Sequence, residues 1–272
     1  MTKKAIPSYS KPPVVEVVWA AHFPPLEWMT AAHAGVYWQL VQKDFPNCDE
    51  QVPMEPKEEP AELLRPPQPI ATLLQKPPLC RQWFVSASGN DVIQLQRDWF
   101  CVNWRKVRQE DQYPRYERMA ESFAARWTQF CDFVKQQGQA PPEVKLLEMT
   151  YINNIYKEQG WSDPKEIGEV FPAVSFQEEH FDFLPAPATF ASGMVFDINA
   201  QAGRLYVSCR HAREIDTNRE FFRLELVSRG RLNGGTLDDI MTWFAHAREW
   251  IVRGFADLTD REIQVKQWGR ER

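Results

Sequence analysis

The sequence predicts an α+β protein made of two pseudo-repeated halves, each a set of antiparallel strands covered by a long amphipathic helix. Short segments in which polar and apolar residues alternate are typical of β-strands, and turn residues separate them. Two longer segments carry apolar residues at steps of three and four, as amphipathic helices do. The order strand, insertion, several strands, aromatic-faced helix occurs in 14–137 and again in 144–257. We therefore expect a layout similar to a saddle or helix-grip fold.

Composition limits the class of protein. The chain has 272 residues, of which 43% are hydrophobic and 25% charged, as in ordinary globular proteins. No apolar run approaches the length of a membrane span, and no apolar segment follows the first four residues. We therefore expect a cytoplasmic protein that does not enter the membrane. Five scattered cysteines without CxxC spacing indicate reduced thiols.

Charge and proline content indicate how the chain is divided. We expect a flexible arm at 1–13, a first half at 14–142, and a second half at 143–272 that packs with the first as one unit. An acidic, proline-rich insertion lies at 45–79, and its run from Asp49 to Glu62 carries six carboxylates against one lysine, an excess equal to the net charge of −5. This insertion is interpreted as a solvated loop or, alternatively, as an arm that docks a partner. Because the remaining charge is balanced, general binding of duplex nucleic acid is not favoured.

Strands are predicted first at Val14–Trp19, continuing toward Phe23. Residues 92–96 and 99–105 alternate between two faces, which predicts two half-buried strands joined by a turn at Arg97–Asp98. A turn at Gly89–Asn90 precedes them and connects them back to Trp83-Phe84-Val85. The second half carries further strand-like segments, at 144–156, 176–184, 194–198, 205–209 and 221–227.

The helices are defined by their apolar faces. An early helix follows the first strand, with a face of Met29, Ala32, Val36, Tyr37, Leu40 and Val41. The central helix begins near Pro114 and ends at Gly138, and its stripe comprises Met119, Phe123, Trp127, Phe130, Cys131 and Val134. The closing helix begins at a capping pair, Thr236 and Asp239. Its stripe comprises Ile240, Trp243, Phe244, Ala247, Trp250, Ile251 and Phe255.

Five sequence blocks together resemble those of a known family. They are P-P-V-V-E at Pro12–Glu16, W-F-C-V-N-W-R-K at Trp99–Lys106, Y-P-R-Y-E at Tyr113–Glu117, Y-I-N-N-I at Tyr151–Ile155 and a closing W-G at Trp268–Gly269. The chain resembles a sporadically distributed family of bacterial proteins of about this length, and the resemblance spans nearly the whole chain. It implies an intact domain but no particular activity. The sporadic distribution implies an accessory role, such as phage defence or a toxin–antitoxin partnership.

Arginines and aromatic residues are concentrated between 97 and 118. Such residues can hold a phosphate or stack on a base. Arg105, Arg115 and Tyr116 are the leading candidates for binding an anion or a partner, with Arg118 and Trp104 beside them. The alternative, which we prefer, is that these arginines pair with neighbouring carboxylates at a strand–helix corner.

Other polar residues are weaker candidates. Glu178, His180 and Asp182 alternate along one predicted strand face and could hold a metal, although a solvated polar face is the preferred interpretation. We expect Asn103 and Asn153 to be buried and hydrogen-bonded.

Glu16 and Glu148 could be paired carboxylates for acid–base chemistry, or structural residues at equivalent positions of the two halves. No GxSxG, P-loop, GxGxxG or HExxH motif is present. We therefore expect a binding or regulatory protein without a cofactor, which works through a protein partner. A nucleic-acid partner and a homodimer are left open. The alternative is an enzyme or binding module that acts on nucleic acid or nucleotides through the Arg/Tyr cluster.

Overall fold

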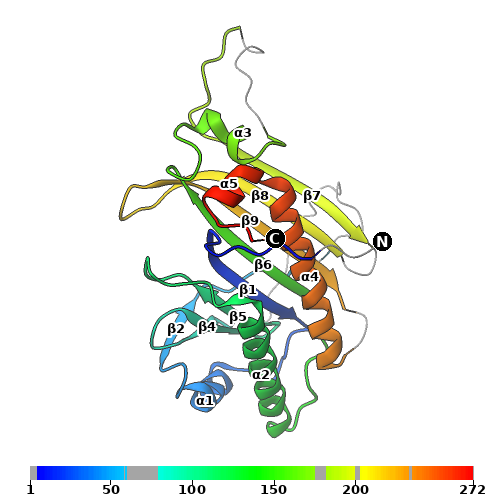
Figure 1. Ribbon diagram of the computed structural model, residues 1–272. Coiled ribbons are helices and arrows are strands. Elements are labelled where there is room, and N and C mark those ends of the chain that lie inside the picture. The colour runs from blue at the N-terminus through cyan, green and yellow to red at the C-terminus, as the bar shows by residue number, and fades with distance from the viewer. Residues whose placement is uncertain are drawn as a thin grey trace. The chain divides into compact units, whose positions relative to one another are not determined.

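The computed structural model describes residues 5–57, 59, 79–174, 182–199, 203–232 and 235–271 (Figure 1). The strands of these residues form one nine-stranded antiparallel sheet in the order β2-β3-β4-β5-β1-β6-β9-β8-β7. The mixture of helices with an antiparallel sheet is thus confirmed, whereas the relation of two halves by a pseudo-twofold stays a prediction. Within the described ranges, no helix is long and apolar enough to cross a membrane.

The chain divides into two compact units, each assembled from separate segments. Unit 1 comprises Met1–Val17, Met149–Ser228 and Phe244–Arg272, and unit 2 comprises Val18–Glu148 and Arg229–Trp243. Four elements have residues in both units: β1 (Val14–His22), β6 (Leu146–Tyr156), β9 (Glu220–Arg231) and α4 (Leu237–Leu258).

Unit 2 contains the predicted central hairpin. Its complete elements are α1 (Ala31–Val41), β2 (Asn47–Gln51), β3 (Arg81–Val85), β4 (Asp91–Gln96), β5 (Trp99–Arg105) and α2 (Arg115–Gln136). The turn at Arg97–Asp98 is confirmed, because β4 ends directly before it and β5 begins directly after it. Gly89 has a φ of 81°, which suits the turn predicted at Gly89–Asn90.

Both helices of unit 2 cover the same face of its strands. Phe100 stacks on Phe130 of α2 with ring centroids 5.0 Å apart, and Tyr37 of α1 lies 5.9 Å from Phe84. The predicted burial of Trp127 is confirmed, since 5% of it is exposed. The expectation that β5 is half-buried is wrong, because Cys101 on its second face is buried as well.

The predicted helix stripes are only partly right. In α2, Phe133 belongs to the buried stripe and Cys131 is half-buried instead. In α1, Val36 and Leu40 are exposed, against the prediction. Tyr37 and Val41 are buried as predicted, and with Ala34 they form a narrower stripe than the one predicted.

Part of the predicted insertion at 45–79 is a strand. β2 pairs with β3 in antiparallel register, Asp49 opposite Trp83. The interpretation as a loop is therefore wrong for Asn47–Gln51. This edge strand is largely exposed and so lacks the alternation by which strands are recognised in a sequence.

Unit 1 has its own aromatic core. Its remaining elements are η1 (Pro164–Glu166), α3 (Ile167–Val170), β7 (Ala191–Asn199), β8 (Gly203–Arg213) and α5 (Arg261–Lys266). Trp161 and Phe222 have ring centroids 4.3 Å apart.

The capping pair of α4 is confirmed, since the Thr236 hydroxyl donates to Asp239 at 2.7 Å. Trp250, in contrast, is 39% exposed and lies off the buried stripe.

The two ends of the chain meet in unit 1. The N–H of Ser10 donates to the carbonyl of Gly269, and the N–H of Lys11 to that of Trp268, each at 3.0 Å. Trp268 is fully buried beside Phe255.

A strand was also predicted at 176–184. Residues 175–181 lie outside the described ranges, and residues 182–184 form no strand.

Candidate functional site

The strands of unit 2 carry polar and aromatic side chains, most of them buried, on the side opposite α1 and α2. Because side chains alternate along a strand, Trp83 faces away from Phe84, and Trp99 faces away from Phe100. The register aligns Trp83 with Gln94 and Gln94 with Cys101. We call this surface the polar face; its residues are Arg81, Trp83, Gln94, Gln96, Trp99, Cys101, Asn103 and Arg105.

Amide side chains on the polar face form hydrogen bonds to one another and to side chains of β3. The Oε1 of Gln94 accepts from the indole N–H of Trp83 at 2.9 Å and from Arg81 at 3.0 Å. The Nε2 of Gln94 donates to Asn103 at 2.9 Å. Asn103 is buried and hydrogen-bonded, as predicted. This network fixes the positions of Arg81 and Trp83.

Cations and aromatic rings form a continuous row across the polar face. The guanidinium of Arg81 lies 5.4 Å from the ring of Trp83 and 5.8 Å from that of Trp99. Arg105 lies 5.2 Å from the same Trp83 ring. His22, at the end of β1, stacks on Trp99 with centroids 5.9 Å apart. Each guanidinium thus lies over an indole ring, at a distance that suits a cation–π interaction.

Several polar atoms of this row have no hydrogen-bond partner. Among the described residues, none binds the buried Nε of Arg81, the Nε1 of Trp99 or the Nε2 of His22. Nor does any described carboxylate lie within ion-pair distance of Arg81 or Arg105. A buried donor left unsatisfied costs about 1–3 kcal/mol, so three such atoms in one row need an explanation.

A buried carboxylate lies close to the His22 end of the row. Glu148 accepts from the Nε of Arg229 at 2.7 Å and from the Nζ of Lys57 at 3.1 Å. Burial alone would raise the pKa of Glu148, but Arg229 and Lys57 together lower it below its ordinary value. Glu148 is therefore ionised and doubly paired, so it is unsuited to accept a proton near neutral pH.

His22 is neutral at physiological pH. Burial lowers its pKa to about 4, and the nearby charge of Glu148 only partly opposes this effect. The neutral ring has one nitrogen that can donate and one that can accept. The row therefore offers donors from Arg81 and Trp99 and a nitrogen of either kind from His22.

The structure distributes the five predicted binding residues over different surroundings. Arg105 belongs to the polar face, and its Nε donates to the carbonyl of Gly89 at 3.0 Å. Trp104 is buried on the opposite face of β5. Arg118 pairs with Asp91 at 2.7 Å, which is the predicted alternative to ligand binding. Tyr116 packs on Trp19 with centroids 5.3 Å apart.

Arg115 has unusual backbone geometry. It is exposed and begins α2 with a φ of 74°, in the left-handed region that favours glycine. Of the five predicted binding residues, Arg105 thus lies on the polar face and Trp104 on the opposite face of β5, and binding of a ligand by these residues stays a prediction.

Sequence reasoning connected Trp83–Val85 of β3 to the hairpin, but it did not include Arg81 or Trp83 among the candidate binding residues. Arg81 and Trp83 are two residues apart and therefore share a face, but only the pairing of β3 with β4 brings them to Gln94 and Trp99. The alternation of R-Q-W-F-V was the available signal. It predicts a strand, and it does not say which neighbouring strand provides the rest of the site.

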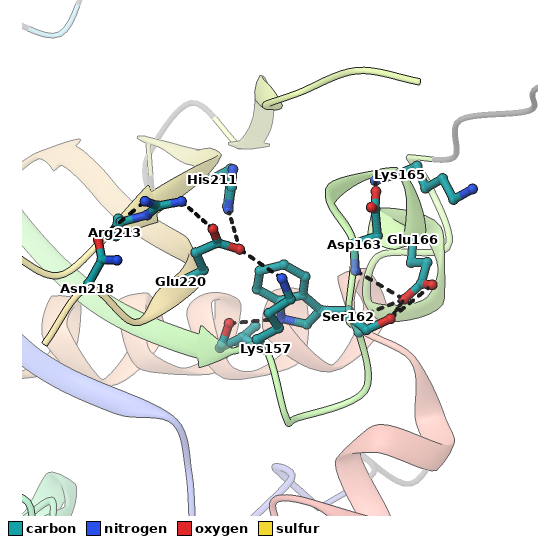
Figure 2. Close-up of polar contacts among 11 residues, drawn as sticks. Lys157, Ser162, Asp163, Lys165, Glu166, His211, Arg213, Asn218 and Glu220 are labelled. Carbon is teal, nitrogen blue, oxygen red and sulfur yellow. Dashed lines mark hydrogen bonds and ion pairs between the residues drawn. The ribbon is translucent and has the colours of Figure 1, made fainter. Parts of the chain in front are cut away.

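Unit 1 carries a second polar cluster, around Glu220 (Figure 2). The Oε2 of Glu220 accepts from the Nζ of Lys157 at 3.1 Å and lies 3.8 Å from the Nε2 of His211, while its Oε1 binds Arg213. The hydrogen bonds from Lys157 and Arg213 lower the pKa of Glu220. Its charge is therefore neutralised within the protein.

The adjoining loop in Figure 2 is stabilised in the same way. Glu166 accepts from the backbone N–H of Ser162 at 2.7 Å, and Asp163 accepts from the N–H of Lys165 at 3.0 Å. These bonds cap η1 at its beginning. The cluster and the loop have their carboxylates occupied, so they favour a structural role.

The remaining sequence candidates are accounted for as follows. Glu178 and His180 lie outside the described residues, and Asp182 is exposed. Within the parts of the chain that the structure describes, no group of three metal-binding side chains occurs. Asn153 is buried, and its amide donates to the carbonyl of Leu224 at 3.2 Å, as expected. Glu16 is half-buried in unit 1.

Comparison with known proteins adds no assignment: no protein-family model matches the chain, and no curated protein matches it.

Proposed function

We propose that this protein is a binding protein whose ligand is a small phosphorylated molecule of nucleotide size, held on the polar face of unit 2. The observation that carries the proposal is Arg81, a half-buried guanidinium against two tryptophan rings without a described carboxylate partner. A ligand that brings an anionic group would provide the missing counter-charge and accept from the Nε of Arg81.

Phosphate suits this geometry better than a neutral ligand does. A guanidinium presents its donors in a planar fork that matches the oxygens of phosphate, and charge-assisted hydrogen bonds are about twice as strong as neutral ones. Arg81 and Arg105 lie against the same Trp83 ring, so two guanidinium groups are available close together. A planar base can use the same aromatic surface by stacking.

The ligand is expected to be short rather than a long polymer. Binding of a polyanion relies on a broadly basic surface, and this chain has a net charge of −5. A mononucleotide needs only the local charge of Arg81 and Arg105. Two cations hold Glu148 in its ionised form, so it is unsuited to act as a base. This agrees with a binding role. A regulatory role in defence and a protein partner stay predictions of the sequence.

Titration calorimetry with adenosine diphosphate tests the proposal. We expect wild-type protein to bind it, and adenosine without phosphate to bind at least tenfold more weakly. The change Arg81→Gln should weaken binding about tenfold or more, because a charge-assisted bond contributes about 1.5–3 kcal/mol. Arg105→Gln should have a similar effect. The melting temperature of each variant is measured alongside to establish that it is folded, because Arg81 also donates to Gln94 and Arg105 to the carbonyl of Gly89.

Arg126 provides a matched control in the same unit. It too lies over an aromatic ring, 5.1 Å from Phe45, but it is paired with Asp44 at 2.6 Å. Arg126→Gln should therefore leave the affinity for adenosine diphosphate unchanged. If wild-type protein binds neither this probe nor inorganic phosphate, or if Arg81→Gln binds as tightly as wild type, the proposal is wrong.

A further inference from the structure

The strand β7 of unit 1 lies at one end of the sheet. Its only partner among the described strands is β8, on one side. Most of its residues are exposed, including Val195 and Phe196, each 41% exposed. An edge strand with apolar side chains presents unpaired backbone groups, to which another strand can add.

The direction of the backbone groups along β7 follows from one hydrogen bond. The N–H of His211 donates to the carbonyl of Phe190 at 2.8 Å, and the register places these two residues opposite each other. In an antiparallel pair, backbone groups point toward and away from the partner strand alternately. Gly193 and Val195 therefore direct their N–H and C=O groups away from β8, toward the unpaired edge.

The usual protections of an edge strand are scarce on β7. Ala191–Asn199 contains no proline and no lysine, the residues that commonly block such edges. Its one charged side chain, Asp197, is paired with Arg204 of β8 at 2.7 Å. A register shift between Asp197 and Asn199 disturbs only the end of the strand. The section from Ala191 to Asp197 is thus a regular, nearly uncharged edge.

We propose that two copies of this chain associate by antiparallel pairing of β7 with β7, around a twofold axis through Val195. Val195 then exchanges both backbone hydrogen bonds with the partner's Val195. In this register Met194 lies opposite the partner's Phe196, so the exposed phenyl ring is covered by a thioether, a favourable contact. Asp197 lies opposite the partner's Gly193, so no two like charges face each other.

A second copy fits this edge because β7 complements itself. The same register pairs Met194 with the partner's Phe196 on one face of the joined strands. On the other face it places Val195 on the twofold axis, and Asp197 lies beside a glycine. A C2 interface requires this kind of self-complementarity. The inference does not depend on the ligand proposed for unit 2.

Sedimentation equilibrium over a dilution series tests the proposal. Wild-type protein should be a dimer that dissociates on dilution, and Val195→Pro should be a monomer. Proline removes the outward N–H of Val195 and leaves the hydrogen bonds to β8 intact, because those belong to the neighbouring residues. The control Val195→Thr keeps both the N–H and a β-branched side chain and should remain a dimer.

The proposal is overturned by a wild-type monomer at every concentration, or by a folded Val195→Pro variant that stays a dimer. If Val195→Pro does not fold, Val195→Lys decides instead. It keeps the N–H and places two positive charges on the axis, so a folded monomer is expected, and an undiminished dimer contradicts the pairing.

Discussion

At the scale of single residues, the polar face differs from other places where the protein buries a polar atom. The indole nitrogen of Trp268 and the hydroxyl of Ser228 also lack a partner among the described residues. Those atoms occur singly. On the polar face, Arg81, Trp99 and His22 lie in contact with one another and each has an unsatisfied nitrogen. Their cost to stability accumulates in one place, as in binding sites that are completed by a ligand.

His22 gives the protein a pH-dependent stability. Its pKa of about 4 in the folded protein is below its ordinary value of 6.5, chiefly because of burial. As the pH falls from about 6.5 to 4, the unfolded chain binds a proton that the folded protein does not. The free energy of unfolding should therefore decrease in this window, by up to about 1 kcal/mol per pH unit.

Urea denaturation at several pH values measures this contribution. We expect His22→Gln to be less sensitive to pH than wild type between about 6.5 and 4, because glutamine does not titrate. The exposed Thr128 provides a control without a titrating group, and Thr128→Ala should keep the wild-type slope in this window. Equal slopes for wild type and His22→Gln would show that this ring is not the source of the effect.

At the scale of elements, the sequence predicted those elements that depend on residues close together in the chain. The hairpin of β4 and β5, the stripe of α2 and the cap of α4 all follow from alternation, helical spacing or a pair of residues three apart. The strand β2 could not be predicted, because Asp49 and its neighbours are stabilised by hydrogen bonds to β3 rather than by burial. The short helix α5 was not predicted either, although Asp260 caps it by accepting from the N–H groups of Glu262 and Ile263.

The candidate site was harder to predict than the elements that carry it. Arg105 was identified because arginine and tryptophan are close together in the sequence. Glu148 binds Lys57 across a separation of 91 residues, and no pattern in the sequence couples the two. Arg81 lies in a five-residue strand, and its role depends on Trp99, which reaches it only through the sheet.

The stability of unit 2 should depend strongly on the aromatic stripe of α2. Trp127 packs on Phe100 with ring centroids 5.6 Å apart and on Phe123 at 6.2 Å. Trp127→Ala should lower the free energy of unfolding by about 3–5 kcal/mol, since it leaves a large cavity. The neighbouring Thr128 is exposed, and Thr128→Ala should change stability by less than about 0.5 kcal/mol in the same denaturation experiment. A loss of similar size in both variants would contradict this packing.

At the scale of the whole molecule, both units are built from segments far apart in the sequence. Unit 1 joins the first residues of the chain to the last, through the pairing of Ser10 and Lys11 with Trp268 and Gly269. Unit 2 brings together strands β3 to β5, the end of β1 and Glu148. The polar face exists only when these segments have assembled, so binding there requires the folded unit.

The central claim is that the polar face binds a phosphorylated ligand, and the indole N–H of Trp99 reports on it directly. In a ¹⁵N-labelled sample, its resonance is assigned by comparison with Trp99→Phe and followed during addition of adenosine diphosphate. The account predicts a downfield shift as this donor gains an acceptor, while the indole resonance of Trp268 in unit 1 stays constant. A Trp99 resonance that does not move at saturating ligand, while resonances elsewhere do, would contradict the account.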